Sequence, residues 1–354
     1  MSEKKKLFDY VIGNPPYQES RETTKDMPVY NYFMDGAYQV GEKVELITPA
    51  RFLFNAGATP KDWNKKMLYD THFKVLKYGA SSSDFFSNTD IKGGIAITYH
   101  DASKAYDAIE TFTPYPEMNS IKAKILDVAN FQSLSEIIYS PAAYKFSETL
   151  HQEHPKIRYR EENGKNVGKL SKGNDYMLAT NVLEKLPEIF TISPTEGYEC
   201  GQIIGLVKGK REFRYIRVDY LNYPDNFYHY KIIIPEANGS GAIGEVLSTP
   251  LIGTPLIGHT QSFISIGSFR TNAEAEACLK YVKGKFSRAL LGILKITQHN
   301  QRPTWKYVPL QDFSPSSDID WSKPISDIDQ QLYRKYGLSK EEIDFIESHV
   351  KEMS

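Results

Sequence analysis

The most constraining feature of the sequence is a short apolar segment that runs directly into two consecutive prolines. Residues 7–12 (LFDYVI) are rich in aromatic and β-branched side chains, which predicts a buried β-strand that ends at Gly13. Pro15 and Pro16 have no N–H to donate to a sheet, and the residue before each proline is pushed away from the helical region. The sequence therefore predicts a stiff loop at the carboxyl end of a strand, which in open α/β sheets is the edge where ligands bind.

The side chains of this loop suit a flat ligand that carries an exocyclic amine. The carboxamide oxygen of Asn14 and the carbonyl oxygen of Pro15 can both accept hydrogen bonds, and Tyr17 offers a face on which a base can stack. An adenine pulled out of its duplex needs these contacts. When both N6 hydrogens are held, the nitrogen lone pair can attack a methyl sulfonium, and fixed acceptors help most in the transition state. The plain alternative is a proline turn that only ends the strand.

Residues 9–17 (DYVIGNPPY) resemble the catalytic motif of amino-group methyltransferases that use S-adenosylmethionine. The resemblance is greatest to the adenine-N6 DNA methyltransferases of bacterial restriction–modification systems. It implies site-specific methylation of double-stranded DNA in such a system. It also implies one catalytic loop, made of Asn14, Pro15, Pro16 and Tyr17.

The resemblance implies a second aromatic contact to the adenine. In related enzymes, a phenylalanine in a polar loop before a strand packs on the other face of the flipped base. Phe86 lies five residues before the apolar segment 91–99 and matches that position, and Phe85 is the neighbouring alternative. Tyr17 and Phe86 would then sandwich the adenine, and stacking contributes about 1–3 kcal/mol per base. The alternative for Phe86 is a ring that fills the core.

The segment that should bind the cofactor is not found. In the common motif order, a glycine-rich S-adenosylmethionine loop and an acidic strand precede the catalytic loop, but only six residues precede Leu7. Downstream, residues 239–244 (GSGAIG) satisfy G-x-G-x-x-G, but Pro250 and Pro255 break any following helix and no acid follows at the required distance. We interpret this segment as a loop. The cofactor-binding residues are unknown. We expect a partner protein, which is either a separate polypeptide that carries the cofactor-binding half or a restriction subunit.

The predicted fold class is α/β with three regions. Residues 1–112 form a partial Rossmann-like methyltransferase domain without its cofactor-binding half, 113–313 an α+β target-recognition domain, and 314–354 a short helical tail. Residues 271–295 are predicted as one helix, because Thr271 and Glu274 make a capping box before a long apolar periodicity.

The net charge of −1 conceals an uneven distribution of charge. Residues 270–306 contain eight basic and two acidic side chains, whereas 311–354 contain five and ten. A basic segment before an acidic tail can form a DNA-binding face, although scattered solvated charge is the alternative. The expected DNA contacts lie in a basic turn, on the polar face of the predicted helix, and in a segment rich in base-reading side chains. They are Lys208, Lys210, Arg211, Lys283, Lys285, Arg288, Gln298, Asn300 and Arg302.

Several function classes are disfavoured. Cys200 and Cys278 form no disulfide framework or metal-binding spacing, so we expect no metal and a cytoplasmic protein. No signal peptide and no apolar run of membrane length is found. Protein-glutamine and RNA methyltransferases can share the Asn-Pro-Pro-Tyr loop, but they usually need no downstream domain of this size. The main alternative is a DNA-recognition module without methylation activity of its own.

Overall fold

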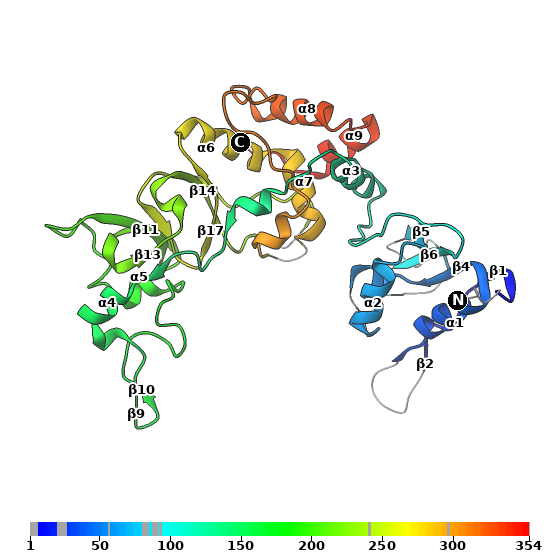
Figure 1. Ribbon diagram of the computed structural model, residues 1–354, viewed down its shortest axis with the longest axis horizontal. Coiled ribbons are helices and arrows are strands. Elements are labelled where there is room, and N and C mark those ends of the chain that lie inside the picture. Colours follow the sequence, from blue (N-terminus) through cyan, green and yellow to red (C-terminus); the bar gives the residue numbers. More distant parts are fainter. Residues whose placement is uncertain are drawn as a thin grey trace. The chain divides into compact units, whose positions relative to one another are not determined.

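The computed structural model describes residues 6–19, 27–55, 57–79, 85–86, 91, 94–239, 242–295 and 298–353 (Figure 1). They form a mixed α/β structure that divides into two compact units, Met1–Asn119 and Ser120–Ser354. The expected α/β class is confirmed at this level. The finer division into a partial Rossmann-like domain, a target-recognition domain and a tail stays a prediction.

The first unit is built around a four-stranded sheet in the order β1-β4-β6-β5. The strands are β1 (Phe8–Gly13), β4 (Gly41–Pro49), β5 (Phe73–Gly79) and β6 (Ile95–Asp101). β1 runs parallel to β4, and α1 (Tyr30–Val40) connects them, which makes a β-α-β unit. The other neighbours in the sheet are antiparallel. The remaining elements are β2 (Gln18–Glu19), β3 (Met27–Pro28), the 3-10 helix η1 (Arg51–Phe54) and α2 (Lys61–Leu68).

The core of the first unit lies on one face of this sheet. Met34 of α1 and Met67 of α2 pack against Val44, Phe73 and other inward side chains of the strands. These helices form because their apolar side chains recur at helical spacing. The apolar side chains buried on the sheet are therefore those that face α1 and α2.

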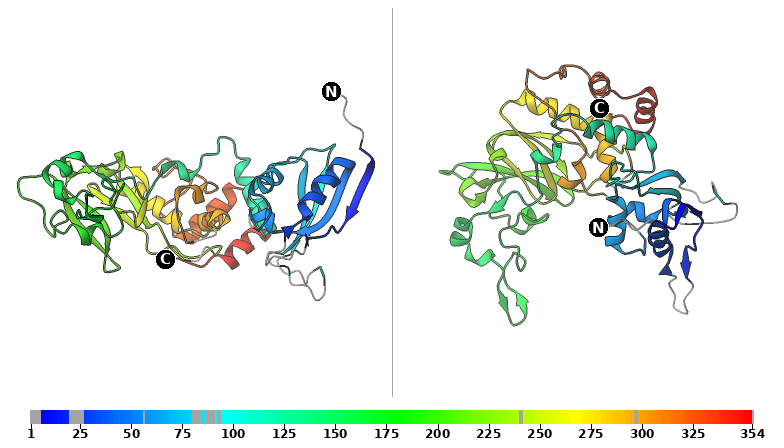
Figure 2. Two further views of the ribbon diagram at one scale, coloured as in Figure 1. Left: turned by 90° about the horizontal axis from the view of Figure 1, so that it is seen from below. Right: turned by 45° about the vertical axis from the view of Figure 1, so that its right-hand side comes forward.

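The prediction that residues 7–12 form a buried strand is wrong in one respect. The strand exists, but it is an edge strand whose side chains at Phe8, Tyr10 and Ile12 are 57%, 64% and 77% exposed. An apolar run identifies a strand, but it does not identify what lies on each face of it. The border position of β1 is visible in both Figure 1 and Figure 2.

The second unit contains two principal sheets and several short strand pairs. One sheet has the order β15-β14-β17-β7, and the other has the order β12-β11-β16. Their strands are β7 (Ile138–Tyr139), β11 (Cys200–Val207), β12 (Lys210–Arg217), β14 (Tyr230–Pro235), β15 (Leu251–Gly253), β16 (Ile257–His259) and β17 (Phe263–Phe269). The short pairs are β8 (Lys145–Phe146) with β13 (Leu221–Asn222), and β9 (Glu161–Glu162) with β10 (Lys165–Asn166).

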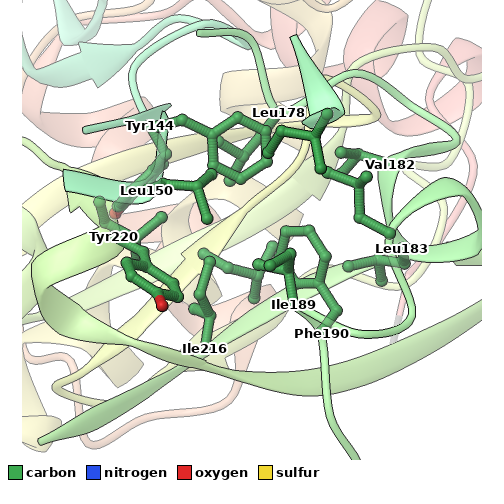
Figure 3. Close-up of a cluster of buried hydrophobic side chains, with 14 of the residues drawn as sticks. Tyr144, Leu150, Leu178, Val182, Leu183, Ile189, Phe190, Ile216 and Tyr220 are labelled. Carbon is green, nitrogen blue, oxygen red and sulfur yellow. The ribbon is translucent and has the colours of Figure 1, made fainter. Parts of the chain in front are cut away.

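A large hydrophobic cluster supports the β11–β12 sheet. Figure 3 shows Tyr144, Leu150, Phe190 and Ile216 converging in this cluster with neighbouring aliphatic side chains. The short helices α4 (Glu148–Glu153) and α5 (Val182–Lys185) contribute Leu150 and Val182 to it. This packing gives the β11–β12 hairpin a firm base.

A buried lysine joins three segments of the second unit. The ammonium of Lys231 in β14 donates to the carbonyl oxygens of Ile257 at 2.7 Å, Thr254 at 3.3 Å and Phe227 at 3.4 Å. Burial lowers the pKa of Lys231 to about 7. Burial also lowers the pKa of the nearby His259 imidazole, to about 4, so this histidine is neutral at physiological pH.

Two helices, rather than one, occupy residues 272–294. The Thr271/Glu274 capping box is confirmed at the start of α6 (Asn272–Lys283), but the chain breaks at Gly284 and restarts as α7 (Lys285–Leu294). The carboxylate of Asp329 accepts hydrogen bonds from the backbone N–H groups of Lys285 and Phe286, at 2.9 and 3.1 Å. The cap of α7 therefore comes from a residue more than forty positions away, which the local sequence does not reveal.

The last part of the chain packs on these helices. It contains α8 (Ile325–Lys335) and α9 (Lys340–His349), and a Ser339/Glu342 capping box starts the second helix. The second unit also contains most of α3 (Pro116–Leu126) and η7 (Arg302–Trp305), a 3-10 helix. Within the described ranges, no helix is long and apolar enough to cross a membrane, and no three metal-binding side chains gather in one place.

Candidate active site and nucleic-acid interface

The Asn-Pro-Pro-Tyr loop leaves the sheet at the carboxyl end of β1, where Gly13 lies beside Leu46 of β4. Asn14 and Pro16 are exposed, and Pro15 and Tyr17 are half-buried. The backbone N–H of Val29 donates to the Tyr17 carbonyl oxygen at 3.1 Å, which fastens the end of the loop to the start of α1. The loop therefore has a held backbone and an accessible amide side chain.

The Tyr17 side chain is placed to act as a neutral ring. Its hydroxyl is buried and lacks a hydrogen bond of good geometry within the described residues. Burial raises the pKa of Tyr17, and the neighbouring Asn14 side chain acts in the opposite direction. The phenol therefore stays protonated at neutral pH, and Tyr17 offers an aromatic face rather than a base.

A second residue at this edge of the sheet was not singled out from the sequence. Because β1 and β4 are parallel, the segment after β4 emerges at the same edge as Asn14. Ala50 is held there by a hydrogen bond from its N–H to the Gly94 carbonyl oxygen at 3.0 Å, and the next residue, Arg51, is exposed. The Pro49-Ala50-Arg51 sequence after a strand was the available signal for this cation.

The structure leaves the expected adenine sandwich untested. Phe86 is half-buried, and the ammonium of Lys77 in β5 lies 5.2 Å from the centre of the neighbouring Phe85 ring. β5 is at the opposite edge of the sheet from β1. Residues 87–90, which follow Phe86, lie outside the described ranges. The pairing of Phe86 with Tyr17 across a base therefore stays a prediction.

The basic turn predicted near residue 208 is the tip of the β11–β12 hairpin. Lys208 and Gly209 both have positive φ, 49° and 75°, as a tight two-residue hairpin turn requires. Lys208 and Lys210 are exposed there. Arg211 is instead engaged with the protein, because its guanidinium donates to the carbonyl oxygens of Thr249 at 2.6 Å and Ser248 at 2.8 Å. The hairpin thus presents two lysines to solvent, while Arg211 holds the neighbouring loop.

The predicted basic face of residues 280–288 is largely covered by the C-terminal segment. Lys280 donates to the Trp321 carbonyl oxygen at 2.7 Å, and Lys285 pairs with Glu347 at 2.5 Å. Lys283 is half-buried at the end of α6. These lysines therefore lie beside the tail, and DNA contact through Lys283 and Lys285 stays a prediction.

Arg288 requires a correction, since it is 1% exposed. Its guanidinium donates to carbonyl oxygens at Lys283 (2.8 Å), Gly244 (3.2 Å), Glu245 (3.3 Å) and Lys351. Burial lowers its pKa to about 10. Helical spacing placed Arg288 on a polar face, but backbone carbonyls from distant segments cover that face. Arg288 therefore has a structural role, and its side chain does not reach solvent.

The residues of the expected base-reading segment also divide into exposed and buried ones. Gln298 and Arg302 are exposed. Asn300 is fully buried, its side-chain amide donates to the Pro235 carbonyl oxygen at 3.1 Å, and its N–H donates to the Glu236 carbonyl oxygen at 2.7 Å. The prediction of a base contact for Asn300 is corrected accordingly, because this side chain pins the segment to the end of β14.

The residues of the 239–244 segment do not fit a nucleotide cofactor. Residues 240–241 lie outside the described ranges, but the residues on either side of them contact other parts of the protein. Lys295 donates to the Asn238 carbonyl oxygen at 2.8 Å and pairs with Glu245. A Cβ at Gly244 would lie 2.6 Å from the Cα of Val350, and turns rather than a helix follow. The described residues of this loop therefore provide no helix N-terminus or open cradle for S-adenosylmethionine.

Comparisons with known proteins give one family match. Residues 1–86 match the model of the family described as Eco57I restriction-modification methylase, which supports a restriction–modification methylase. No curated protein matches the sequence.

Three solved structures of restriction or restriction-modification enzymes show weak similarity to this chain. The type IIG restriction endonuclease BpuSI has a TM-score of 0.32 and 8% identity over 92% of this chain and 50% of its own. The type IIL restriction-modification enzyme MmeI, in complex with DNA, has a TM-score of 0.33 and 10% identity over 96% and 56%. The ATP-dependent type ISP enzyme LlaBIII, bound to DNA, has 0.23 and 12% over 81% and 28%. The chain thus spans about half the length of BpuSI and MmeI, 50% and 56%.

Proposed function

We propose that this chain is the catalytic-loop and DNA-recognition part of an adenine-N6 DNA methyltransferase from a restriction–modification system. The observation that carries the proposal is the Asn14-Pro15-Pro16-Tyr17 loop, which is accessible at the carboxyl end of a parallel strand. This loop lies inside the segment that matches a restriction–modification methylase family. Ligands of open α/β sheets bind at this edge, so an accessible amide there is well placed for chemistry on a base.

The proposed mechanism assigns two acceptors to one amine. The Asn14 side-chain oxygen and the Pro15 carbonyl oxygen accept the N6 hydrogens of a flipped adenine. Because the loop backbone is already held at Tyr17 by Val29, little reorganisation is needed as positive charge develops on the amine. The neutral ring of Tyr17 stacks on the adenine, and Phe86 covers the other face in the sandwich that the sequence predicts.

The second unit is assigned to DNA binding. Its exposed candidates are Lys208 and Lys210 at the hairpin tip, together with Gln298 and Arg302. The lysines would contact phosphates, which makes their contribution sequence-independent and sensitive to salt. Gln298 and Arg302 carry the side-chain types that read adenine and guanine edges. Arg51 would contribute a phosphate contact beside the catalytic loop.

The methyl donor is assigned to a second polypeptide. S-adenosylmethionine supplies the methyl group, and the described residues of the 239–244 loop do not fit it. The separate polypeptide would carry the cofactor-binding half, so that the two chains together make one active site. A restriction subunit is the other partner that such a system would contain.

The test is methyl transfer from radiolabelled S-adenosylmethionine to DNA, with and without the cofactor-binding polypeptide. Incorporation at adenine N6 that requires both chains, and that Asn14→Ala abolishes while DNA binding persists, is the expected result. Methylation at another atom, or equal loss of DNA binding in Asn14→Ala, would contradict the proposed role of the loop.

The second candidate function is DNA recognition without methylation. The described residues of the 239–244 loop favour it, because they do not fit the cofactor and a chain without a cofactor site would have no activity of its own. Calorimetric titration of the chain with S-adenosylmethionine separates the cases. Tight binding by this chain alone would contradict the assignment of the cofactor to a partner, and sequence-specific DNA binding without methylation in any mixture would favour the second candidate.

A further inference from the structure

Strand β1 carries a row of uncovered apolar side chains. Phe8, Tyr10 and Ile12 alternate along the strand and therefore point to the same face of the sheet. More than half of each side chain is exposed, and Leu7, just before the strand, is 74% exposed. Soluble proteins rarely leave contiguous apolar rows in water unless another molecule covers them.

The two faces of β1 are treated differently by the rest of the unit. Val11, which points to the opposite face from Tyr10, packs against the core that contains Met34 of α1 and Val44 of β4. On the other face, the described contact of Tyr10 is with Lys43, whose ammonium lies 3.5 Å from its hydroxyl and 5.3 Å from its ring centre. No helix among the described residues packs on the Phe8, Tyr10 and Ile12 face.

The edge of β1 is open as well. β4 is its neighbour on one side, and no described strand pairs with it on the other. The outward N–H and C=O groups of an edge strand are a template for another strand. Parallel pairing adds a further constraint, because parallel strands occur almost entirely in sheets with both faces covered. Among the described residues, β1 therefore lacks a strand on its second edge and a cover on the face of Phe8, Tyr10 and Ile12.

We infer that β1 binds a strand of the partner polypeptide that carries the cofactor-binding half, and that a helix of this partner covers Phe8, Tyr10 and Ile12. The identity of the partner rests on the proposed function, whereas the docking mode rests on the sheet. A strand added parallel to β1 extends the sheet over a length of about 20 Å, given the strand's six residues at about 3.3 Å each.

The handedness of crossover connections explains why the uncovered face is the one opposite α1. The β1-α1-β4 crossover places α1 on one face as the chain moves away from β1 in one direction. A sheet that continues from β1 in the other direction, through right-handed crossovers, places its helices on the opposite face. The direction in which successive strands are added to the sheet then reverses at β1. The crevice at such a switch point is the usual ligand site, and Asn14 lies there.

The experiment measures binding between this full chain and a defined probe. The probe is the separately expressed polypeptide, encoded in the region adjoining this chain's, that carries a glycine-rich loop and an acidic strand. Affinity is measured by biolayer interferometry for the wild type, for Ile12→Lys and for Phe8→Glu. Tyr32→Lys is the matched control, because Tyr32 is an equally exposed aromatic, at 65%, on the outside of α1.

We expect the probe to bind the wild type and Tyr32→Lys alike. Ile12→Lys and Phe8→Glu should weaken binding about tenfold or more, because each places a charge in an apolar interface. Both variants should keep the wild-type circular dichroism and urea midpoint, since the replaced side chains are exposed in the free chain. Hydrogen exchange should show new protection of the β1 amides in the wild-type complex.

Other outcomes overturn the inference. They are an adjoining region that encodes no such polypeptide, a probe that does not bind, and binding that Tyr32→Lys weakens and Ile12→Lys does not. Self-association of the chain through β1, abolished by Ile12→Lys, would assign the edge to a second copy instead. If the complex forms through β1 but does not methylate DNA, the docking mode survives and the proposed function fails.

Discussion

Arg288→Ala should lower the unfolding free energy of the second unit by about 3–5 kcal/mol. It should not change direct contacts with DNA. Arg288 was expected on a DNA-binding face, yet it is buried and donates to carbonyl oxygens of Lys283, Gly244, Glu245 and Lys351. The same substitution therefore separates a structural role from a DNA-binding role.

The magnitude follows from two opposing terms. A hydrogen bond to a charged group contributes about 1.5–3 kcal/mol, so the four contacts of Arg288 would sum to at least about 6 kcal/mol if they were independent. Burying the guanidinium has a desolvation cost, which is visible in its pKa of about 10. Removing the side chain relieves this cost but leaves carbonyl oxygens without their donor. The net loss is thus smaller than the sum.

The assay is urea unfolding followed by tryptophan fluorescence in a Trp63→Phe background. Trp63 belongs to the first unit, whereas Trp305 is fully buried in the second, so the signal then reports the second unit. Arg288→Lys should fall between wild type and alanine, because an ammonium retains some of the donors. Arg302→Ala is the matched control, since that arginine is exposed and its loss should change stability by less than about 0.5 kcal/mol.

In DNA-binding measurements, we expect the two substitutions to have the opposite order of effects. Arg302→Ala should weaken cognate DNA more than random DNA, whereas folded Arg288→Ala should bind as the wild type does. If Arg288→Ala kept wild-type stability and lost DNA binding, the structural assignment of this arginine would be refuted. A uniform loss in Arg302→Ala, with a shallower salt dependence, would reassign Arg302 to a phosphate contact.

Three further outcomes are expected. In the reconstituted enzyme, Asn14→Ala should lower kcat by about 10²-fold or more with little change in DNA affinity, as single-turnover methylation and fluorescence anisotropy can measure. The unfolding free energy should rise with pH between about 7 and the ordinary lysine pKa near 10.5. In this range the unfolded state binds a proton that the buried Lys231 has lost. Lys231→Met should remove this pH dependence in urea melts at pH 7, 8 and 9. Ser339→Ala should cost about 1 kcal/mol by removing the cap of α9, whereas Ser326→Ala, at an exposed serine, should cost less than about 0.5 kcal/mol.

Features that depend on neighbouring residues were predictable from the sequence. The capping box at Thr271 and the basic turn at Lys208-Gly209 both formed as expected. Each is set by side chains or backbone preferences within a few positions. The loop after β1 was predictable for the same reason, because two consecutive prolines follow the end of the strand.

Features that depend on distant segments were not predictable. Arg288 has the spacing of an exposed helical residue, but its partners at Gly244 and Lys351 lie far away in the sequence. The break at Gly284 is stabilised by Asp329 in the same way. Asn300 is a residue type that can read bases, and its structural role comes from its contact with the end of β14. In each case, a polar side chain met backbone groups that no local pattern encodes.

In the proposed assembly, the exposed strand β1 connects the Asn14 loop to the partner polypeptide that would carry the cofactor-binding half. Asn14 follows Gly13 without a spacer, so a strand that binds β1 also fixes the point from which the loop departs. Ile12→Lys and Asn14→Ala should then fail for different reasons. The first reduces the fraction of assembled enzyme, so a higher concentration of the partner polypeptide should restore methylation by mass action. The second removes an acceptor from a complete site, and no concentration of partner should restore it. Equal rescue of both variants would mean that Asn14 acts in assembly and not on the adenine.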